Sequence, residues 1–451
     1  MTIIHIPGQV RKIIRMLAEA GYQAYAVGGC VRDSLMGVHP HDWDICSSAP
    51  PYKAREIFAG YPVIETGIRH GTITVLLDHT GYEVTTFRTD GAYSDGRHPD
   101  SVCFVHELSE DLRRRDFTIN AMAYNEQDGL VDLFEGAEDI AAGRIRCVGV
   151  PEDRFSEDVL RIMRAVRFAS VLGFSIEEKT AKAVHAYIPA LSRVSVERIT
   201  AELRKMICGK SFGILAREYT DLLVQIIPEL RPCVGFEQKS AWHSYDVWEH
   251  TIRAMEAYRL QAGDQAEELI LLTLLLHDIG KPASCQEEGD VRHFKGHAAA
   301  GAAIADGILR NLRLDNHTRE QVCELIRHHD DNWLPSKKGM RRTISAVGKD
   351  QTERLLAIRR ADIMAQNPDT RQRSLSDLVQ LEEYYRELLR TESCFTVKDL
   401  AVDGKDLMSI GMYPGREMGE MLDWLLDQVL EEMLTNDKEE LLKAASIHRR
   451  A

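Results

Sequence analysis

Two aspartates separated by one residue, Asp42 and Asp44, are the first side chains whose spacing could do chemistry. On a strand, residues i and i+2 point to the same face, so this spacing places two carboxylates side by side. Two negative charges this close repel each other unless a cation lies between them, and oxygen ligands suit Mg²⁺. The pair therefore predicts a magnesium site that serves catalysis. The alternative interpretation is a solvated strand end.

A glycine turn precedes these aspartates. Gly28 and Gly29 are followed by Arg32. Glycines let backbone N–H groups approach a phosphate closely, and a guanidinium nearby can add a charge-assisted hydrogen bond. A Gly-Gly pair alone is more often a plain turn. Its position shortly before the Asp-x-Asp pair favours a role for Gly29 and Arg32 in nucleotide binding.

A third pattern, Asp158 and Arg161, has the i, i+3 spacing that places two side chains on one face of a helix. Cytosine and adenine both present an amine donor beside a ring-nitrogen acceptor. A carboxylate only accepts hydrogen bonds and a guanidinium only donates them, so Asp158 could read the amine and Arg161 the ring nitrogen. Guanine and uracil would leave buried groups unpaired. The alternative is an ordinary salt bridge on a solvated helix.

A fourth pattern combines histidines and aspartates in the second half of the chain. His277 and Asp278 directly follow the apolar run 269–276, where burial without a partner would be costly. Imidazoles and carboxylates from several helices can converge on a divalent or transition metal that leaves positions open for water and phosphate. The candidate ligands are His250, His277, Asp278 and Asp362, with His297 and His329 as further candidates.

Periodicity indicates which elements position these residues. Apolar residues at helical spacing predict a helix over 10–18, and short strands are expected at 25–27, 43–46, 72–77 and 82–87. From Ser156 onward only amphipathic helices are expected, with a boundary near Pro228 and a break between two helices at 413–415. The expected fold class is α+β, with an α/β head over 1–145, an all-α neck and body over 146–235, a helical metal-binding domain over 240–365 and a helical tail over 366–451.

Composition excludes several classes of protein. The chain has 451 residues, 44% of them hydrophobic and 28% charged, which is the balance of a protein with several domains and ample cores. The longest apolar run, 269–276, is far shorter than the ~20 residues of a membrane span, and the N-terminus shows no secretory signal. The nine cysteines form no C-x-x-C pair, which favours reduced thiols and a cytoplasmic location. The net charge of −14 does not exclude a nucleic-acid partner, because metal-binding carboxylates inflate the acidic count.

The first ~230 residues resemble the class II tRNA nucleotidyltransferases, a superfamily that includes the bacterial poly(A) polymerases. The motifs that carry the resemblance are 28–33 and 42–44, the run 114–121, the run 157–164 and the run 198–203. The resemblance implies a polymerase-β-like nucleotidyltransferase head in which Asp42 and Asp44 hold catalytic Mg²⁺, and Glu83 is a candidate third carboxylate. It assigns Asp158 and Arg161 to the incoming base and places Arg115, Arg164 and Arg167 around the nucleotide. The breaker-rich segment 88–99 would be a loop that helps the site switch from C to A addition.

The histidine–aspartate block resembles the HD-superfamily metal phosphohydrolases. This likeness implies core ligands at His250, His277, Asp278 and Asp362, whereas His297 and His329 match extra positions of some members. An HD-like scaffold whose metal site serves no chemistry is the alternative. The segment 400–426 resembles the tail of many tRNA nucleotidyltransferases, which we would not expect on a poly(A) polymerase.

Together these likenesses predict an enzyme that adds or repairs the 3′-terminal CCA of tRNA without a nucleic-acid template. Its expected partners are the tRNA 3′ end, CTP and ATP, with no membrane and no obligate protein partner. The HD domain would supply a possible second, phosphohydrolase activity, with a metal whose identity the sequence leaves open. The alternatives are a poly(A) polymerase, an enzyme that adds only CC or only A, a catalytically idle RNA-binding scaffold, and a phosphohydrolase whose head only recruits RNA.

Overall fold

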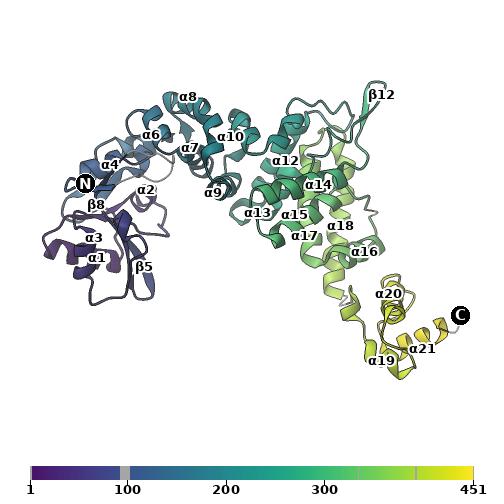
Figure 1. The fold of residues 1–451 in the computed structure, drawn as a ribbon. Coiled ribbons are helices and arrows are strands. Elements are labelled where there is room, and N and C mark those ends of the chain that lie inside the picture. Colours follow the sequence, from purple (N-terminus) through teal and green to yellow (C-terminus); the bar gives the residue numbers. More distant parts are fainter. Residues whose placement is uncertain (1–2, 92–101, 334, 392–393, 450–451) are drawn as a thin grey trace. The chain divides into compact units, whose positions relative to one another are not determined.

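The computed structural model describes residues 3–91, 102–333, 335–391 and 394–449. It divides into two compact units, Met1–Pro228 and Glu229–Ala451, each described here by itself. The first unit combines a β-sheet with helices and the second is almost entirely helical, so the α+β fold class is confirmed (Figure 1). Within these described ranges, no helix is both long and apolar enough to cross a membrane.

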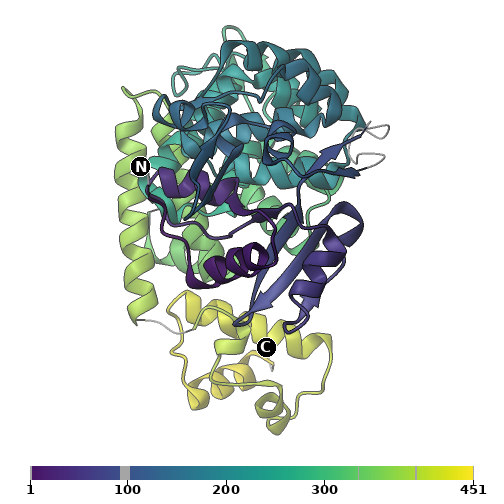
Figure 2. The same cartoon turned by 90° about the vertical axis from the view of Figure 1, so that its left-hand side faces the viewer.

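A β-sheet forms the N-terminal part of the first unit (Figure 2). It has seven strands in the order β3-β4-β5-β2-β1-β8-β9. β2 and β5 run parallel to each other, whereas every other neighbouring pair is antiparallel. The strands are β1 (Ala24–Val27), β2 (Ile45–Ser47), β3 (Val63–Ile64), β4 (Thr72–Leu77), β5 (Thr80–Thr86), β8 (Met122–Asn125) and β9 (Gly129–Asp132). The strands expected at 25–27, 72–77 and 82–87 are therefore confirmed.

Both faces of this sheet are covered by apolar side chains. Successive side chains of β1 point to opposite faces, so Ala24 and Ala26 join one core and Tyr25 and Val27 join another. The first core also receives the apolar stripe of α1, which confirms the helix expected over 10–18. The helices of this part are α1 (Gly8–Glu19), α2 (Gly29–Leu35), α3 (Pro51–Ile57), α4 (Leu108–Arg113) and α5 (Gly136–Ala141).

The rest of the first unit consists of short helices, and α7 packs against α9 (Figure 1). These helices are α6 (Pro151–Glu157), α7 (Leu160–Leu172), α8 (Glu178–Tyr187), α9 (Val196–Ile207), α10 (Phe212–Glu218) and α11 (Thr220–Ile226). The expectation that no strand occurs after Ser156 is wrong here, because β10 (Arg144–Ile145) pairs in parallel with β11 (Ser175–Ile176).

The segment expected to be a loop over 88–99 begins with a strand. β6 (Arg88–Asp90) pairs with β7 (Val102–Phe104) in an antiparallel ribbon. Residues 92–99 lie outside the described residues.

The second unit contains two groups of helices, each with its own apolar core. The first group comprises α12 (Val247–Ala262), α13 (Glu268–Leu276), α14 (His297–Asn311), α15 (Asn316–His328), α16 (Lys337–Val347), α17 (Lys349–Ala365) and α18 (Arg371–Thr391). A short hairpin, β12 (Gln286–Glu288) and β13 (Val291–His293), interrupts it and was not expected from the sequence. The last group comprises α19 (Gly404–Ser409), α20 (Arg416–Leu430) and α21 (Lys438–His448), packed around Leu407, Leu425 and Leu441.

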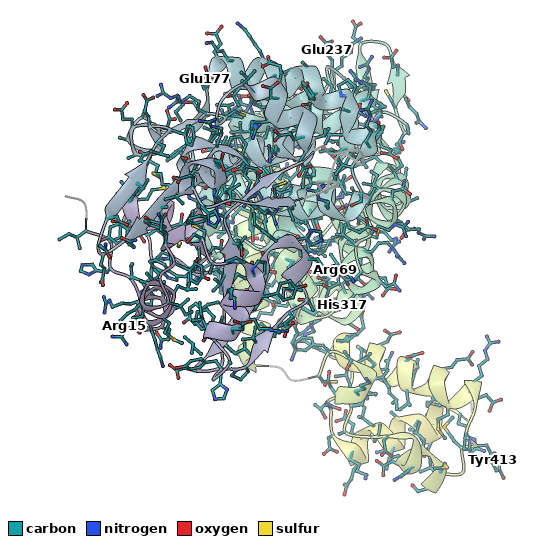
Figure 3. All side chains as sticks on the ribbon, turned by 60° about the vertical axis from the view of Figure 1, so that its left-hand side comes forward. Arg15, Arg69, Glu177, Glu237, His317 and Tyr413 are labelled. Carbon is teal, nitrogen blue, oxygen red and sulfur yellow. The ribbon has the colours of Figure 1, made fainter. Side chains whose placement is uncertain are left out.

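The break predicted at 413–415 is confirmed, because α19 ends at Ser409 and α20 begins at Arg416. Tyr413 in this break is 83% exposed (Figure 3). Helix α18 packs on α16 and α17 through Leu378, Leu381 and Leu388. The four-domain division stays a prediction at this finer level.

Candidate functional site

The glycine turn lies between β1 and α2, and of its two glycines Gly28 is the one whose backbone conformation requires glycine. Gly28 has φ +80°, which L-residues with a side chain rarely adopt, and its N–H donates to the Met122 carbonyl over 3.1 Å. A Cβ at Gly28 would lie 3.1 Å from Nη1 of Arg115, whereas a Cβ at Gly29 would meet only Nη2 of Arg32 at an ordinary 3.7 Å. The turn thus lets the backbone of Gly28 lie close to the guanidinium group of Arg115.

Arg32 is held against the segment that follows α4. Its Nη1 donates to Oδ1 of Asn120 over 2.7 Å and its Nη2 lies 2.7 Å from Oδ1 of Asp33. The Asn120 amide in turn donates to Asp116 over 3.3 Å. Arg32 therefore presents a fixed cation beside the glycine turn.

The two expected metal-binding aspartates precede β2 instead of lying within it. The strand begins at Ile45, so the expectation of a strand over 43–46 is shifted. Exposure nevertheless alternates, because Asp42 and Asp44 are exposed while Trp43 and Ile45 are buried. The two carboxylates consequently share one solvent-facing side, as the i, i+2 argument requires.

Glu83 lies next to this pair because β2 and β5 are parallel neighbours. Ile45 pairs with Val84, which places Glu83 level with Asp44. Loss of hydration raises the pKa of Glu83, and the negative charges of Asp44 and Asp42 raise it further. Loss of hydration also raises the pKa of Asp44, against the opposing charge of Arg115 and with a further increase from Asp42. The three carboxylates therefore repel one another.

A cation would relieve this repulsion, so the donor set fits Mg²⁺. Arg115 offsets the repulsion only in part, since its Nη2 also pairs with the fully buried Asp111 over 3.2 Å. Among the described residues, the groups of three or more ligand atoms that lie within 4.8 Å of one another do not include Asp42, Asp44 or Glu83. The structure thus places these carboxylates beside one another at the central strands β2 and β5 without drawing them into a tight cluster.

The expectation that Asp158 and Arg161 share a helix face is wrong. Helix α6 ends at Glu157 and α7 begins at Leu160, and Asp158 between them is extended, with φ −140° and ψ 103°. Its Oδ2 pairs with Nη2 of Arg198 over 2.7 Å, and its Oδ1 accepts the Leu160 N–H over 3.1 Å. The i, i+3 pairing fails because the chain leaves the helical conformation at Asp158.

Arg161 has different partners. Its Nη1 donates to Oε2 of Glu157 over 2.5 Å and to the Arg154 carbonyl over 3.1 Å, and its Nη2 donates to the Arg114 carbonyl over 3.1 Å. The residue is 9% exposed. Arg161 is therefore fixed between α6 and the segment that follows α4.

Three guanidinium groups from two helices converge on the ring of Phe168. The carbon atoms of the guanidinium groups lie 5.2 Å from the ring centroid for Arg32, 5.3 Å for Arg164 and 3.8 Å for Arg167. Such contacts with an aromatic face are attractive, and they reduce the cost of placing like charges together. The glycine-turn helix α2 and helix α7 thus contribute their guanidinium groups to one cluster around Phe168.

Two buried acids hold the arginines of α7. Arg164 donates through Nε to Oδ2 of Asp116 over 2.7 Å, and Arg167 donates through Nε to Oε2 of Glu202 over 2.5 Å. Burial alone would raise the pKa of Asp116, but the charges of Arg164 and Arg161 lower it to about 2. Asp116 therefore stays ionised and keeps Arg164 in place.

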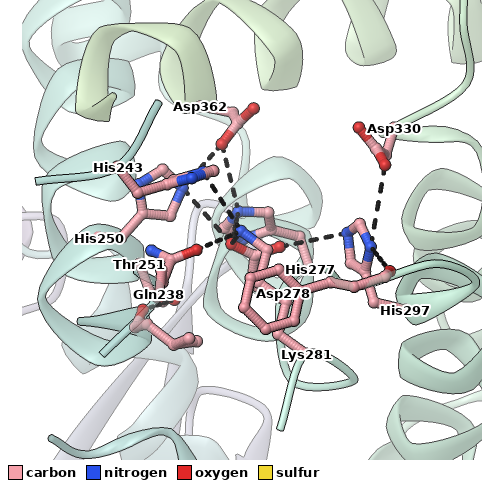
Figure 4. A network of polar contacts seen from close by, with 12 residues as sticks. Gln238, His243, His250, Thr251, His277, Asp278, Lys281, His297, Asp330 and Asp362 are labelled. Atoms are coloured by element: carbon pink, nitrogen blue, oxygen red, sulfur yellow. Dashed lines mark hydrogen bonds and ion pairs between the residues drawn. The ribbon is translucent and has the colours of Figure 1, made fainter. Parts of the chain in front are cut away.

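In the second unit the histidine–aspartate residues are brought together from five helices and their ends (Figure 4). Asp278 lies at the centre of the cluster. Its Oδ2 is 3.4 Å from Nε2 of His250 and 3.2 Å from Nε2 of His277, and its Oδ1 is 3.5 Å from Nε2 of His297 and 3.7 Å from Nε2 of His329. Asp362 approaches Nε2 of His250 to 2.7 Å.

The ligand atoms form two groups that share Asp278. One comprises His250, His277, Asp278 and Asp362, and the other comprises Asp278, His297 and His329. In three of these histidines Nδ1 contacts the carbonyl three residues earlier, at 2.8 Å for His277, 2.9 Å for His297 and 2.6 Å for His329. This contact directs Nε2 toward Asp278, as a hydrogen bond at the other ring nitrogen does for histidine ligands in metal sites.

The environment of this cluster fits a metal ion. Nε2 of His277 and Oδ2 of Asp278 are buried and make no hydrogen bond of good geometry, and a cation would stabilise both beyond what the Lys281 ammonium, 2.6 Å from Oδ2, supplies. Burial alone would raise the pKa of Asp278, but the charges of His277 and Lys281 lower it well below its ordinary value. Positive charge is therefore what stabilises this buried carboxylate.

Several residues around both sites received no role from the sequence. Lys281 places Nζ 2.6 Å from Oδ2 of Asp278, 2.8 Å from Oε1 of Gln238 and 3.5 Å from Nε2 of His243. The i+3 position of Lys281 after Asp278 was a usable signal, whereas the contact with Gln238 depends on tertiary structure. Arg198, Glu202 and Phe168 were likewise given no role, although the first two lie in a motif that the resemblance uses.

Comparisons with known proteins agree with this architecture. Residues 24–146 match the family "Poly A polymerase head domain", residues 173–233 match "Probable RNA and SrmB- binding site of polymerase A", and residues 299–445 match a family described as tRNA nucleotidyltransferase domain 2. A CCA-adding enzyme of Enterococcus faecalis is 35% identical over 100% of this chain and 98% of its own length. One of Lactobacillus delbrueckii is 36% identical over 95% of both chains.

A solved structure also matches this chain over nearly its full length. The CCA-adding enzyme of Bacillus stearothermophilus, crystallised in complex with CTP, is 30% identical and superposes with a TM-score of 0.74 over 99% of this chain and 98% of its own. The resemblance inferred from the motifs is thereby confirmed and extends over the whole chain. The protein belongs to the CCA-adding enzymes, a family of nucleotidyltransferases.

Proposed function

We propose that this chain adds the CCA end to tRNA from CTP and ATP at a site that Asp42, Asp44 and the arginines around Phe168 form together. The observation that carries this proposal is the meeting of the two nucleotide-binding elements. Arg32 follows the glycine turn, Arg164 and Arg167 belong to α7, and their guanidinium groups surround one ring. The relatives' full-length match to CCA-adding enzymes disfavours the poly(A) polymerase alternative.

In this proposal Asp42 and Asp44 would hold Mg²⁺, with Glu83 as an additional carboxylate beside them. When bound, Mg²⁺ supplies charge stabilisation for the attacking hydroxyl oxygen and for the pyrophosphate leaving group. Gly29, Arg32, Arg115, Arg164 and Arg167 would bind the nucleotide. The terminal ribose hydroxyl of tRNA attacks the α-phosphate, and these cations hold the triphosphate in line with it.

Asp158 and Arg161 would read the base. The carboxylate of Asp158 accepts from the exocyclic amine of C or A, and Arg161 donates to the adjacent ring nitrogen. Both side chains have fixed positions through other partners, Arg198 for Asp158 and Glu157 for Arg161. A reader held by the protein can act without a nucleic-acid template because its donors and acceptors are already oriented.

Replacement of Asp158 by alanine tests the base-reading role. We expect slower incorporation and a selectivity for CTP over UTP, and for ATP over GTP, that falls about 10- to 100-fold, since each lost hydrogen bond to a charged group is worth ~1.5–3 kcal/mol. Competition between the four nucleotides on truncated tRNA measures this directly. An Asp158→Ala enzyme with the wild-type preference for CTP and ATP would contradict the proposal.

A second activity is favoured by the cluster around Asp278. We propose that His250, His277, Asp278 and Asp362, together with His297 and His329, hold divalent or transition metal and hydrolyse phosphate esters. The buried ligand atoms of His277 and Asp278, which converge with those of His250 and Asp362, support this. A bound metal would supply an activated water at neutral pH. Asp278 is the residue that joins the two ligand groups, so it is central to any metal site here.

A cytoplasmic location is also proposed. All nine cysteines are free thiols, and Cys30, Cys46, Cys147, Cys233, Cys323 and Cys394 are buried. Reduced cysteines persist in a reducing compartment. This supports a site of action in the cytoplasm.

A further inference from the structure

The orientation of Asp158 must be set by something other than its own helix. Asp158 is extended between α6 and α7, so the helical geometry that would aim its side chain is absent. Two contacts are found at its carboxylate, the Leu160 N–H at Oδ1 and the Arg198 guanidinium at Oδ2. The first comes from two residues along the chain and the second from 40 residues away. Arg198 is therefore the tertiary contact that fixes Asp158.

Helix α9, which packs against α7, carries this arginine in its first turn. Arg198 and Glu202 are spaced i, i+4, so they lie on the same side of α9 one turn apart. Arg198 contacts the acid Asp158, and Glu202 contacts the cations Arg164 and Arg167, at 3.8 Å and 2.5 Å. The two residues thus present opposite charges to two different parts of the proposed nucleotide site.

The salt bridge between Arg198 and Asp158 is sheltered from solvent. The Arg198 side chain is 22% exposed and the Asp158 side chain 15% exposed. Ion pairs that are partly removed from water are less screened than surface pairs and hold their geometry better. Without Arg198, Asp158 would keep the single backbone contact at Oδ1, and its other oxygen would be free to turn toward different donors.

We propose that Arg198 is a positioning residue that sets base selectivity by orienting the carboxylate of Asp158, an inference that rests on the proposed base-reading role of Asp158. Arg198 itself does not touch the base. It acts by holding Oδ2 while Oδ1 is held by Leu160, so that the carboxylate presents a defined set of lone pairs to the exocyclic amine. A carboxylate that rotates can accept from several positions, and discrimination against UTP and GTP weakens.

Glu202 has a separable task. It holds Arg164 and Arg167, whereas Arg198 is the residue that pairs with Asp158, so the loss of Glu202 should weaken the binding of every nucleotide alike. In Glu202→Gln we expect KM for CTP and ATP to rise together while the ratio between right and wrong bases stays as in the wild type. Two residues on one helix would then affect affinity and selectivity independently.

The test measures kcat/KM for CTP, UTP, ATP and GTP on truncated tRNA in Arg198→Met, Arg198→Lys, Glu202→Gln and Asp158→Ala. Lys205→Met is the matched control, because Lys205 is exposed on the same helix and its loss removes one positive charge. We expect the ratio of CTP to UTP to fall about tenfold in Arg198→Met, to recover in large part in Arg198→Lys, which restores the charge, and to stay unchanged in Lys205→Met. These ratios do not depend on the fraction of active protein, so partial unfolding of a variant does not obscure them.

The double variant, Arg198→Met together with Asp158→Ala, tests whether Arg198 acts through Asp158. If Arg198 acts through Asp158, adding Arg198→Met to Asp158→Ala should cause no further loss of selectivity. Wild-type ratios in Arg198→Met, combined with relaxed ratios in Asp158→Ala, would overturn the role of Arg198 and leave the base-reading role of Asp158 intact. Wild-type ratios in Asp158→Ala would instead refute the base-reading role on which the inference rests.

Discussion

Replacing Asp42 or Asp44 by alanine is expected to reduce nucleotide addition about a thousandfold or more. Either change removes an oxygen ligand from the proposed magnesium site, and metal stabilisation of the transition state is worth several kcal/mol. The change removes a proposed metal ligand, while the proposed base-reading residues Asp158 and Arg161 stay intact, so tRNA binding should stay measurable. Steady-state incorporation of labelled CTP into truncated tRNA, with binding measured separately, checks both parts.

Asp153→Ala is a suitable control, because Asp153 is exposed on α6. The substitution removes one carboxylate and leaves the start of β2 unaltered. It should keep the wild-type rate. Near-normal incorporation by Asp44→Ala would show that the metal assignment is wrong. Loss of tRNA binding in the same variant would show that Asp44 contributes to RNA recognition instead of metal binding.

The combined replacement of His277 and Asp278 by alanine is expected to abolish phosphatase or phosphodiesterase activity and to spare CCA addition. Asp278 belongs to both ligand groups, so its loss disrupts every metal position of the cluster. The nucleotidyltransferase residues belong to the other compact unit. Hydrolysis of p-nitrophenyl phosphate and of bis-p-nitrophenyl phosphate, with several divalent metals, measures one activity, and labelled-nucleotide incorporation measures the other.

His328→Ala provides the matched control for this pair. His328 neighbours the ligand His329, but its Nδ1 contacts Asp331 at 2.6 Å and it belongs to neither ligand group. It should retain both activities and the metal content of the wild type. Loss of CCA addition in a folded His277→Ala, Asp278→Ala variant would contradict the separation of the two activities.

Apolar periodicity predicted secondary structure correctly where the apolar residues follow a single helical or strand period. Helix α1 and strand β4 follow from apolar residues at periods of 3.6 and 2, and both are confirmed. The Asp42–Asp44 pair was expected within a strand, but the ladder begins one residue after Asp44. The shared side of the two carboxylates is retained because exposure still alternates, with Trp43 and Ile45 buried and Asp42 and Asp44 exposed.

The pairing of Asp158 with Arg161 could not be predicted by a local rule. The i, i+3 rule assumes a continuous helix, and the extended conformation at Asp158 breaks it. Tertiary contacts then determine the partners, Arg198 for one residue and Glu157 with two carbonyl groups for the other. Sequence spacing carries no information about a partner 40 residues away in the chain.

The histidine–aspartate cluster shows what residue type can and cannot reveal. His277 and Asp278 stood out because two polar residues follow a buried apolar run, and the structure brings them together with the other candidate ligands. The role of Gly280 was not visible from sequence. A Cβ there would lie 2.2 Å from the His297 carbonyl oxygen, so this glycine lets α14 approach and bring His297 to Asp278.

Incorporation of separately supplied nucleotides into tRNA that lacks its 3′ end is the most direct test of whether this chain builds the CCA end. Truncated tRNA is incubated with labelled CTP alone, labelled ATP alone and both together, and the products are resolved at single-nucleotide length. For a CCA-adding enzyme we expect two C residues from CTP alone, no addition from ATP alone to tRNA that lacks CC, and a complete CCA end with both. A long adenylate tract from ATP alone, or a product that stops at CC when both nucleotides are present, would contradict it.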